Sequence, residues 1–215
     1  MNPARHPGRL ETFVWLLIYG LVLTWSAIHP KDRFTWFLEV LPALVGLVVL
    51  ALSRRRFPLT RLLYWLILAH CIVLMIGGHY TYAEVPLFDW IRDQFHLQRN
   101  NYDKVGHFFQ GFVPALIARE LIVRLNLVNG RGWRNFFVLC VVLALSAFYE
   151  LIEWWVALAS GDEAVAFLGT QGDPWDTQSD MFLALIGGSL ALALLSRLHD
   201  RQLRPFLTPA EGDRP

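Results

Sequence analysis

Charge is scarce in this sequence. Asp, Glu, Lys and Arg make up 17% of the 215 residues, hydrophobic residues make up 55%, and the formal net charge is +1. The near-neutral balance gives no indication of a nucleic-acid partner. A soluble domain of this size would not need uninterrupted apolar runs of about 20 residues, the length that spans a bilayer as a helix. The composition therefore predicts an all-α, multi-pass membrane protein.

Cysteine and the common catalytic motifs are nearly or wholly missing. Cys71 and Cys140 fall inside different apolar runs, so we predict small core residues without a disulfide or a redox motif. The chain lacks the HExxH helix, the GxSxG turn, the P-loop and the GxGxxG fingerprint. Phosphatidic-acid-phosphatase and rhomboid signatures are also missing, and neither Ser146 nor Ser179 supports a serine triad. The enzyme classes defined by these motifs are therefore excluded.

Six apolar runs are long enough to cross a membrane. They cover approximately residues 10–28, 34–52, 62–80, 105–123, 136–159 and 181–198. The connections, at most about 20 residues long, leave no room for a soluble domain, so residues 1–215 are expected to form one transmembrane domain. The first run follows basic residues as a signal peptide would. It is long for one and further runs follow, so we interpret it as a transmembrane helix.

The basic residues indicate the orientation, because cytoplasmic ends of membrane proteins are enriched in Lys and Arg. With both termini in the cytoplasm, 14 of the 19 basic residues lie on the inner side. These are Arg5, Arg9, Arg54, Arg55, Arg56, Arg61, Arg119, Arg124, Arg131, Arg134, Arg197, Arg201, Arg204 and Arg214. Of the 18 acids, 13 fall on the outer side, Asp162 and Glu163 among them. We predict an N-in, C-in topology.

Two glutamates interrupt the fifth run, Glu150 and Glu153. Their i, i+3 spacing puts both on one side of a helix, roughly 21–26 Å into a hydrocarbon core about 30 Å thick, in the outer leaflet. They lie in the C-terminal half of the helix, where the helix dipole disfavours negative charge and capping cannot explain them. An ionisable group inside a span is a functional-site hypothesis by default. A purely structural ion pair is the alternative.

Other polar side chains are expected at the same depth. Asp103 and His107 form an i, i+4 stripe at the start of the fourth span, and Asp176 and Asp180 form another before the sixth. His79 ends the third span at this level.

Each of these residues also has a structural alternative. Asn101 can cap the fourth helix, with Asp103 favoured at its positive end. Thr177-x-x-Asp180 matches a capping box. His79 is typical of an interfacial side chain, whereas His107 is placed deeper.

Together these residues predict a metal site. The predicted ligands are Glu150, Glu153, Asp176, Asp180 and His107, and the predicted catalytic residues are Glu150, Glu153, His107 and Asp103. An oxygen-rich set of this kind suits Mg²⁺, Mn²⁺ or Ca²⁺, and Zn²⁺ if histidines take part. No spacing in the set is diagnostic of one metal.

Four segments also resemble a known family. They are residues 101–108 (NYDKVGHF), 111–115 (GFVPA), 148–155 (FYELIEWW) and 168–181 (LGTQGDPWDTQSDM). On these the chain resembles the YjdF-like family of bacterial inner-membrane proteins, over most of its length. The resemblance implies a multi-pass protein of the inner membrane and implies no activity. The Asp-Lys-x-Gly-His-Phe element is also similar, locally, to that of VanZ-like membrane proteins.

Three functions fit this pattern. The first is a metal-dependent enzyme that acts on a membrane lipid or lipid-linked envelope substrate at the outer leaflet. There the cation would polarise the substrate or activate water, and a non-ligating acid or His107 would move the proton. The second is a small proton- or cation-coupled transporter or binding protein, although no inverted repeat is visible. The third is a structural membrane factor whose polar cluster fixes the helix packing.

Overall fold

The computed structural model describes residues 8–160, 165–168 and 170–207. Arg5, Asp162, Glu163 and Arg214, which entered the predictions above, lie outside these ranges. The described residues form helices and contain no strand. The helices are α1 (Arg9–Ala27), α2 (Arg33–Ser53), α3 (Arg61–His79), α4 (Pro86–Phe95), α5 (Tyr102–Arg124), α6 (Arg131–Ser160), α7 (Val165–Leu168) and α8 (Asp176–Leu207).

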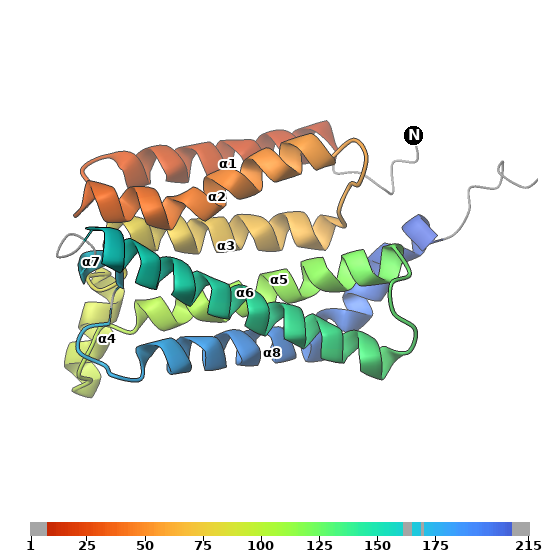
Figure 1. Cartoon of the computed structure of the whole chain (residues 1–215). Coiled ribbons are helices and arrows are strands. Elements are labelled where there is room, and N and C mark those ends of the chain that lie inside the picture. Colours follow the sequence, from red (N-terminus) through yellow and green to blue (C-terminus); the bar gives the residue numbers. More distant parts are fainter. Residues whose placement is uncertain (1–7, 161–164, 169, 208–215) are drawn as a thin grey trace, which may run out of the picture.

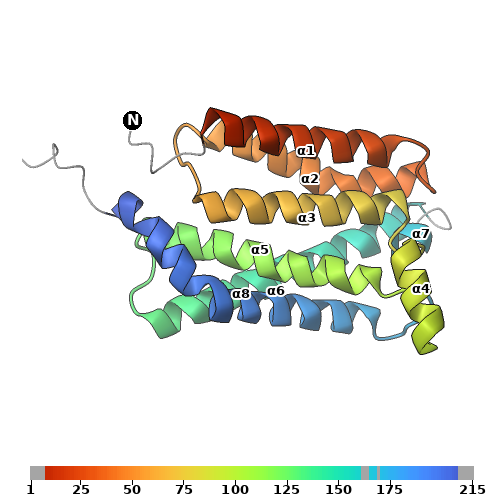
Figure 2. The ribbon, with the colours of Figure 1, turned by 180° about the vertical axis from the view of Figure 1, so that it is seen from behind.

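The long helices form two layers that run roughly alongside one another. Helices α1, α2 and α3 make one layer, and α5, α6 and α8 make the other (Figure 1). The start of α1 and the end of α8 lie at the same end of the bundle, which we call the terminal end. Helix α4 lies across the opposite end, which we call the α4 end, and is steeply inclined to the long helices in both views (Figures 1 and 2). Each long helix therefore connects the two ends.

Five of these helices, α1, α2, α3, α6 and α8, are long and apolar enough to cross a membrane. The predicted spans agree with α1, α2 and α3 to within one residue at each end. Helices α6 and α8 extend beyond the predicted runs, to Arg131 at one end and Leu207 at the other, because their polar turns continue the helix. Cys71 is buried as predicted, but Cys140 is exposed and the expectation of a core residue there is wrong.

Helix α5 differs from the five in composition. It is 23 residues long, enough to span a bilayer, but it carries charged residues near both of its ends. Many of its residues are nevertheless buried, since α3, α6 and α8 all pack against it. Helix α5 is thus the polar helix at the centre of the bundle.

Helix α4 was not predicted from the sequence. Pro86 occupies its first turn, where a missing backbone N–H costs nothing, and His96 ends it in the left-handed conformation with φ 52°. Its polar side carries Asp89 and Arg92, which form an ion pair at 2.8 Å. Phe88 packs edge-on against Tyr102 of α5. The helix is amphipathic, too short to span, and is fixed to the end of the bundle by its apolar side.

Glycines allow α5 and α8 to approach closely. A Cβ added at Gly111 of α5 would overlap the backbone of Ala184, and one added at Gly187 of α8 would overlap the backbone of Phe108. Small residues at helix crossings permit this contact in membranes, where van der Waals packing is a main source of helix association. The close crossing determines how α5 and α8 face one another at both ends.

At the terminal end, several polar side chains are buried between α5, α8 and the start of α3. Glu120 of α5 accepts hydrogen bonds from the Thr60 backbone (3.1 Å), the Thr60 hydroxyl (2.8 Å) and Arg124 (2.9 Å). It also contacts His199 Nε2 of α8 at 3.0 Å, and Arg119 contacts His199 Nδ1 at 3.1 Å. We call these five residues the terminal clamp. It ties α5, α8 and the start of α3 together.

Candidate functional site

Near the α4 end, α5 and α8 bring together Asp103, His107 and Asp180. His107 Nε2 lies 3.4 Å from Asp103 Oδ1 and 3.8 Å from Asp180 Oδ2. One donor atom from each of the three residues lies within 4.8 Å of the others. Asp103 and His107 share a face because they are four residues apart on α5, and the close crossing of α5 and α8 brings Asp180 to the same place.

Glu150 of α6 completes this group, which we call the carboxylate–histidine cluster (Asp103, His107, Glu150 and Asp180). Its Oε1 lies 3.9 Å from His107 Nδ1. The same Nδ1 lies 3.1 Å from Gln110 Oε1, one turn along α5. His107 therefore stands at the centre, with two aspartates at one ring nitrogen and an amide and a glutamate at the other.

Two carboxylate oxygens in the cluster are buried without a partner. Among the described residues, Asp180 Oδ1 and Glu150 Oε1 have no solvent exposure and no hydrogen bond. Neither carboxylate has a Lys or Arg of the described chain within ion-pair distance. A buried acceptor left unpaired costs about 1–3 kcal/mol, and more when it is charged. A proton or a bound cation would therefore stabilise these oxygens.

Asp103 lies in the first turn of α5, where its charge suits the helix dipole, but neither side-chain cap predicted from the sequence forms. Helix α8 already begins at Asp176, so Thr177 lies inside it and cannot cap it in the way that a capping box requires. Asn101 occupies the cap position of α5, but its side chain makes no capping hydrogen bond. Asn100 takes the equivalent role: its Oδ1 accepts from the Tyr102 backbone N–H at 3.1 Å.

The neighbouring Asp176 has a different partner. Arg99 Nη1 contacts Asp176 closely, and Nη2 lies 3.3 Å from Asp103 Oδ2. Burial opposes the charge of Arg99, but the hydrogen bond and charge of Asp176, together with Asp103, outweigh it, so the Arg99 pKa is raised. Asp176 is thus held by a permanent cation. It lies beside the cluster and does not face His107 within ion-pair distance.

Behind His107 lies a cavity of about 80 Å³ between the two helix layers, which we call the central cavity. Glu153, predicted beside Glu150, lines this cavity, as do Asp103 and His107. Glu150 and Glu153 therefore lie in different surroundings, since Glu150 contacts His107 in the cluster and Glu153 faces the cavity.

The central cavity contains residues that the sequence analysis did not select. Glu39 of α2 and His70 of α3 line it, and Tyr149 Oη donates to Glu39 Oε2 at 3.2 Å. The signal for Glu39 and His70 was present, because each is an ionisable residue inside an apolar span. A single such residue does not reveal which way its helix faces, and so the pattern could not connect them to the cluster.

Tyr82 closes the cavity toward the α4 end. It lines the cavity and is buried, at φ 56°, a left-handed conformation that a bulky residue rarely adopts. Its ring fills the space beside Gly77 and Gly106, where an added Cβ would overlap it. The burial of this large ring between α3 and α5 offsets the unfavourable backbone conformation.

His79 lies apart from the cluster. Its Nδ1 is 3.0 Å from the Ser26 carbonyl oxygen, and its ring packs against Trp25 and Tyr80. These contacts join α3 to α1 and match the interfacial role given above as the alternative.

Comparison with known proteins identifies the family. Residues 11–201 match the family described as predicted membrane protein (DUF2238). The inner membrane protein YjdF of Escherichia coli (strain K12) is 55% identical over 190 residues, which cover 88% of this chain and 91% of that protein. No solved structure matches. The resemblance stated from the four segments is confirmed, and this integral inner-membrane protein belongs to the DUF2238 family.

Proposed function

We propose that the carboxylate–histidine cluster binds a divalent cation and that the protein uses it as a metal-dependent enzyme on a lipid or lipid-linked substrate at the outer leaflet. The observation that carries the proposal is the buried, unpartnered Asp180 Oδ1 beside His107 Nε2 and Asp103. Histidine and carboxylate donors converging from two helices are a common way to build a metal site in a bundle.

The spacing of the donors suits a cation. Each ligand of Mg²⁺ or Zn²⁺ lies about 2.1 Å from the metal and each ligand of Ca²⁺ about 2.3–2.6 Å, so ligands on opposite sides are at most roughly 4–5 Å apart. The donors of Asp103, His107 and Asp180 lie within 4.8 Å of one another. Asp103 thereby replaces Asp176 in the ligand set derived from the sequence, because Asp103 Oδ1 lies 3.4 Å from His107 Nε2 whereas Asp176 faces Arg99.

The hydrogen bonding of His107 supports the same assignment. Gln110 Oε1 can accept a hydrogen bond from Nδ1–H, which leaves the lone pair of Nε2 facing the two aspartates. A hydrogen bond of this kind at the second nitrogen fixes the tautomer of metal-binding histidines. The alternative state, a protonated ring between two aspartates, would leave Asp180 Oδ1 unpartnered all the same.

The bound cation would polarise a phosphoester or diphosphate oxygen, or lower the pKa of a water. Glu150, whose Oε1 is free and lies next to His107, would accept the proton. The central cavity is far smaller than the 300–1,000 Å³ of usual ligand pockets, so substrate would approach from the α4 end. Lys104, which donates to Ser179 there, offers a positive charge for an anionic group.

A proton- or cation-coupled transporter is the second candidate, favoured by the acids of the central cavity. Between the cavity and the terminal clamp, however, most buried side chains of α5 and its neighbours are apolar, Val113, Leu116, Val142 and Ala184 among them, although Ser146 of α6 is a buried polar exception. A transport path would need polar groups or water through this layer. The enzyme proposal needs no such path.

The proposed topology has six crossing helices, with both termini in the cytoplasm. Helix α5 crosses the membrane in addition to the five apolar helices, and its charges lie near its ends or against other helices rather than in lipid. Basic side chains are enriched at the terminal end, as expected for a cytoplasmic side. The cluster then lies in the outer leaflet.

Single cysteines test this topology. In a Cys71→Ala, Cys140→Ala background, Trp90→Cys on α4 should react with a membrane-impermeant maleimide in intact spheroplasts, because Trp90 is exposed at the α4 end. Arg131→Cys at the terminal end should react only after permeabilisation. The reverse pattern would overturn the orientation.

Metal binding tests the centre itself. The purified protein should bind about one Mn²⁺ per chain, and excess Mn²⁺ should raise its Tm, because a ligand at 100 times its Kd stabilises the folded state by about 2.7 kcal/mol. Asp180→Asn should weaken binding at least about tenfold, by analogy with losses seen when metal-site partners are removed. The measurements are metal analysis by mass spectrometry, titration calorimetry and thermal unfolding with Mn²⁺, Mg²⁺ and Zn²⁺.

The control is Glu84→Gln, which removes an exposed acid paired with Lys31 at the same end. It should leave binding unchanged. Wild-type protein without saturable binding of any of the three cations would refute the proposal, as would equal binding by Asp180→Asn. If Asp180→Asn only altered the Tm without metal, the cluster would be a structural element.

A further inference from the structure

We propose that a groove between α1 and α2, at the terminal end, binds an acyl chain of one anionic phospholipid whose phosphate is held by Arg54. The site lies at the opposite end from the carboxylate–histidine cluster and does not depend on the function proposed for it.

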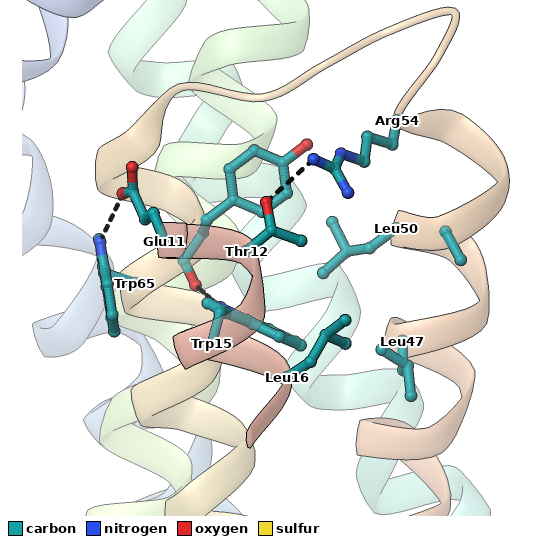
Figure 3. Close-up of a pocket in the computed structure, with 10 residues that line it drawn as sticks. Glu11, Thr12, Trp15, Leu16, Leu47, Leu50, Arg54 and Trp65 are labelled. Atoms are coloured by element: carbon teal, nitrogen blue, oxygen red, sulfur yellow. Dashed lines mark hydrogen bonds between the residues drawn. The ribbon is translucent and has the colours of Figure 1, made fainter. Parts of the chain in front are cut away.

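The groove follows from the packing of the first three helices. Helices α1 and α2 each pack closely against α3, but their backbones approach one another at few places. A cavity of about 150 Å³ remains between them at the terminal end. Leu16 of α1 faces Leu47 and Leu50 of α2 across it (Figure 3). Its floor is fixed by Trp15, whose Nε1 donates to the Tyr64 carbonyl of α3 at 2.7 Å.

The size and lining suit hydrocarbon. An engineered apolar cavity of about 150 Å³ in another protein binds benzene, a six-carbon ligand. The groove could therefore hold the upper part of an acyl chain, with the rest of the chain in the bilayer. Its walls are helices that would face lipid, so the occupant can enter sideways from the inner leaflet.

The polar end of the groove is basic. Arg54 points from α2 toward α1 and donates to Thr12 at 3.0 Å (Figure 3). Arg55 and Arg56 follow it, and within the described ranges none of these three arginines has a carboxylate in ion-pair distance. Basic side chains beside the inner leaflet attract anionic headgroups, and pockets of this kind between helices hold them.

The one acid in the lining is already engaged. Glu11 Oε1 accepts from Trp65 Nε1 at 3.0 Å, and Glu11 Oε2 lies 2.9 Å from Arg61. Figure 3 shows the Glu11 carboxylate directed to Trp65, away from Arg54. An incoming phosphate thus meets Arg54 without a competing carboxylate, while the acyl chain meets leucines.

Native mass spectrometry of the detergent-purified full chain tests the proposal, with dioleoyl phosphatidylglycerol and dioleoyl phosphatidylethanolamine as probes of equal chain length. The first binding constant should favour phosphatidylglycerol about fivefold, the preference expected of one basic residue at a membrane surface. Arg54→Gln should abolish that preference, and Arg54→Lys should restore part of it. Leu50→Trp, which fills the groove and keeps the charge, should weaken binding of both lipids.

The matched control is Arg131→Gln, an exposed arginine of α6 at the same end but outside the groove. It should keep the wild-type preference. Equal preference in Arg54→Gln and wild type, or equal loss in Arg131→Gln, would show general charge attraction and overturn the site. Unchanged binding in Leu50→Trp would exclude the groove. Thermal unfolding of each variant, compared with wild type, identifies any loss caused by misfolding.

Discussion

Glu120→Ala should lower the free energy of unfolding by about 3–5 kcal/mol, the usual cost of removing one partner from a buried charged network. Glu120 has no exposed surface and accepts from Thr60, Arg124 and His199. Since Arg119 can only donate, His199 accepts at Nδ1 and donates from Nε2 to Glu120. Loss of the carboxylate would leave the buried donors of Thr60, at the start of α3, and of His199, on α8, without this acceptor.

Unfolding in mixed micelles with increasing SDS measures this change. Glu84→Ala is the control, because Glu84 forms an ion pair with Lys31 in which both side chains are more than half exposed. Exposed pairs contribute about 0–1 kcal/mol, so the control should hardly change the free energy of unfolding. Similar losses in the two variants would contradict the assignment of the terminal clamp as a buried, mutually satisfied network.

Gly111→Ala is expected to destabilise the protein by about 1–3 kcal/mol, as overpacking does in a close-packed interior. The added methyl group would overlap the backbone of Ala184, so α5 and α8 would have to separate. Asp180 lies one helical turn before Ala184. The separation would therefore draw Asp180 away from His107, and Mn²⁺ affinity should fall together with stability.

Gly46→Ala is the matched control for this substitution. The same methyl group at Gly46 of α2 meets no atom within 4 Å. A glycine inside a helix costs roughly 0.5–1 kcal/mol relative to alanine, so this variant should be neutral or more stable. Opposite signs for the same chemical change would place the effect of Gly111→Ala in the helix crossing. A destabilised Gly46→Ala would instead indicate a general effect of altered helix propensity.

The sequence predicted the long helices well because hydropathy and helix length are set by the same apolar residues. It missed α4, since ten residues with Asp89 and Arg92 among them are too short and polar for a hydropathy signal. It also ended α8 too early. The turns around Arg201 are polar but still helical, and apolar content does not determine where a helix stops.

The candidate site was predictable where spacing along one helix was sufficient. Asp103 and His107 share a face by their i, i+4 spacing, and the alternating direction of the helices predicted Glu150 at their level, where it lies 3.9 Å from His107. The separation of Glu150 from Glu153 into different surroundings depends on how α6 is rotated. The capture of Asp176 by Arg99 depends on the path of the chain before α5. Hydropathy and residue spacing predict neither the rotation of α6 nor the path of this segment.

The polarity of α5 has a consequence for how the protein is made. In the six-span topology proposed above, the charges near both ends of α5 would oppose its insertion, because a charged residue costs up to about 2.5–3.5 kcal/mol on the translocon scale when it lies near the middle of a helix, so α5 would gain little by leaving the insertion machinery alone. Its closest neighbour, α8, begins roughly 50 residues later, which at 5–20 residues per second takes on the order of 3–10 s of synthesis. During that interval His199 has not been synthesised, so Glu120 lacks this hydrogen-bond partner. We expect α5 to stay shielded by the translocon or an insertase until α8 emerges, so that the two helices enter the lipid as a pair.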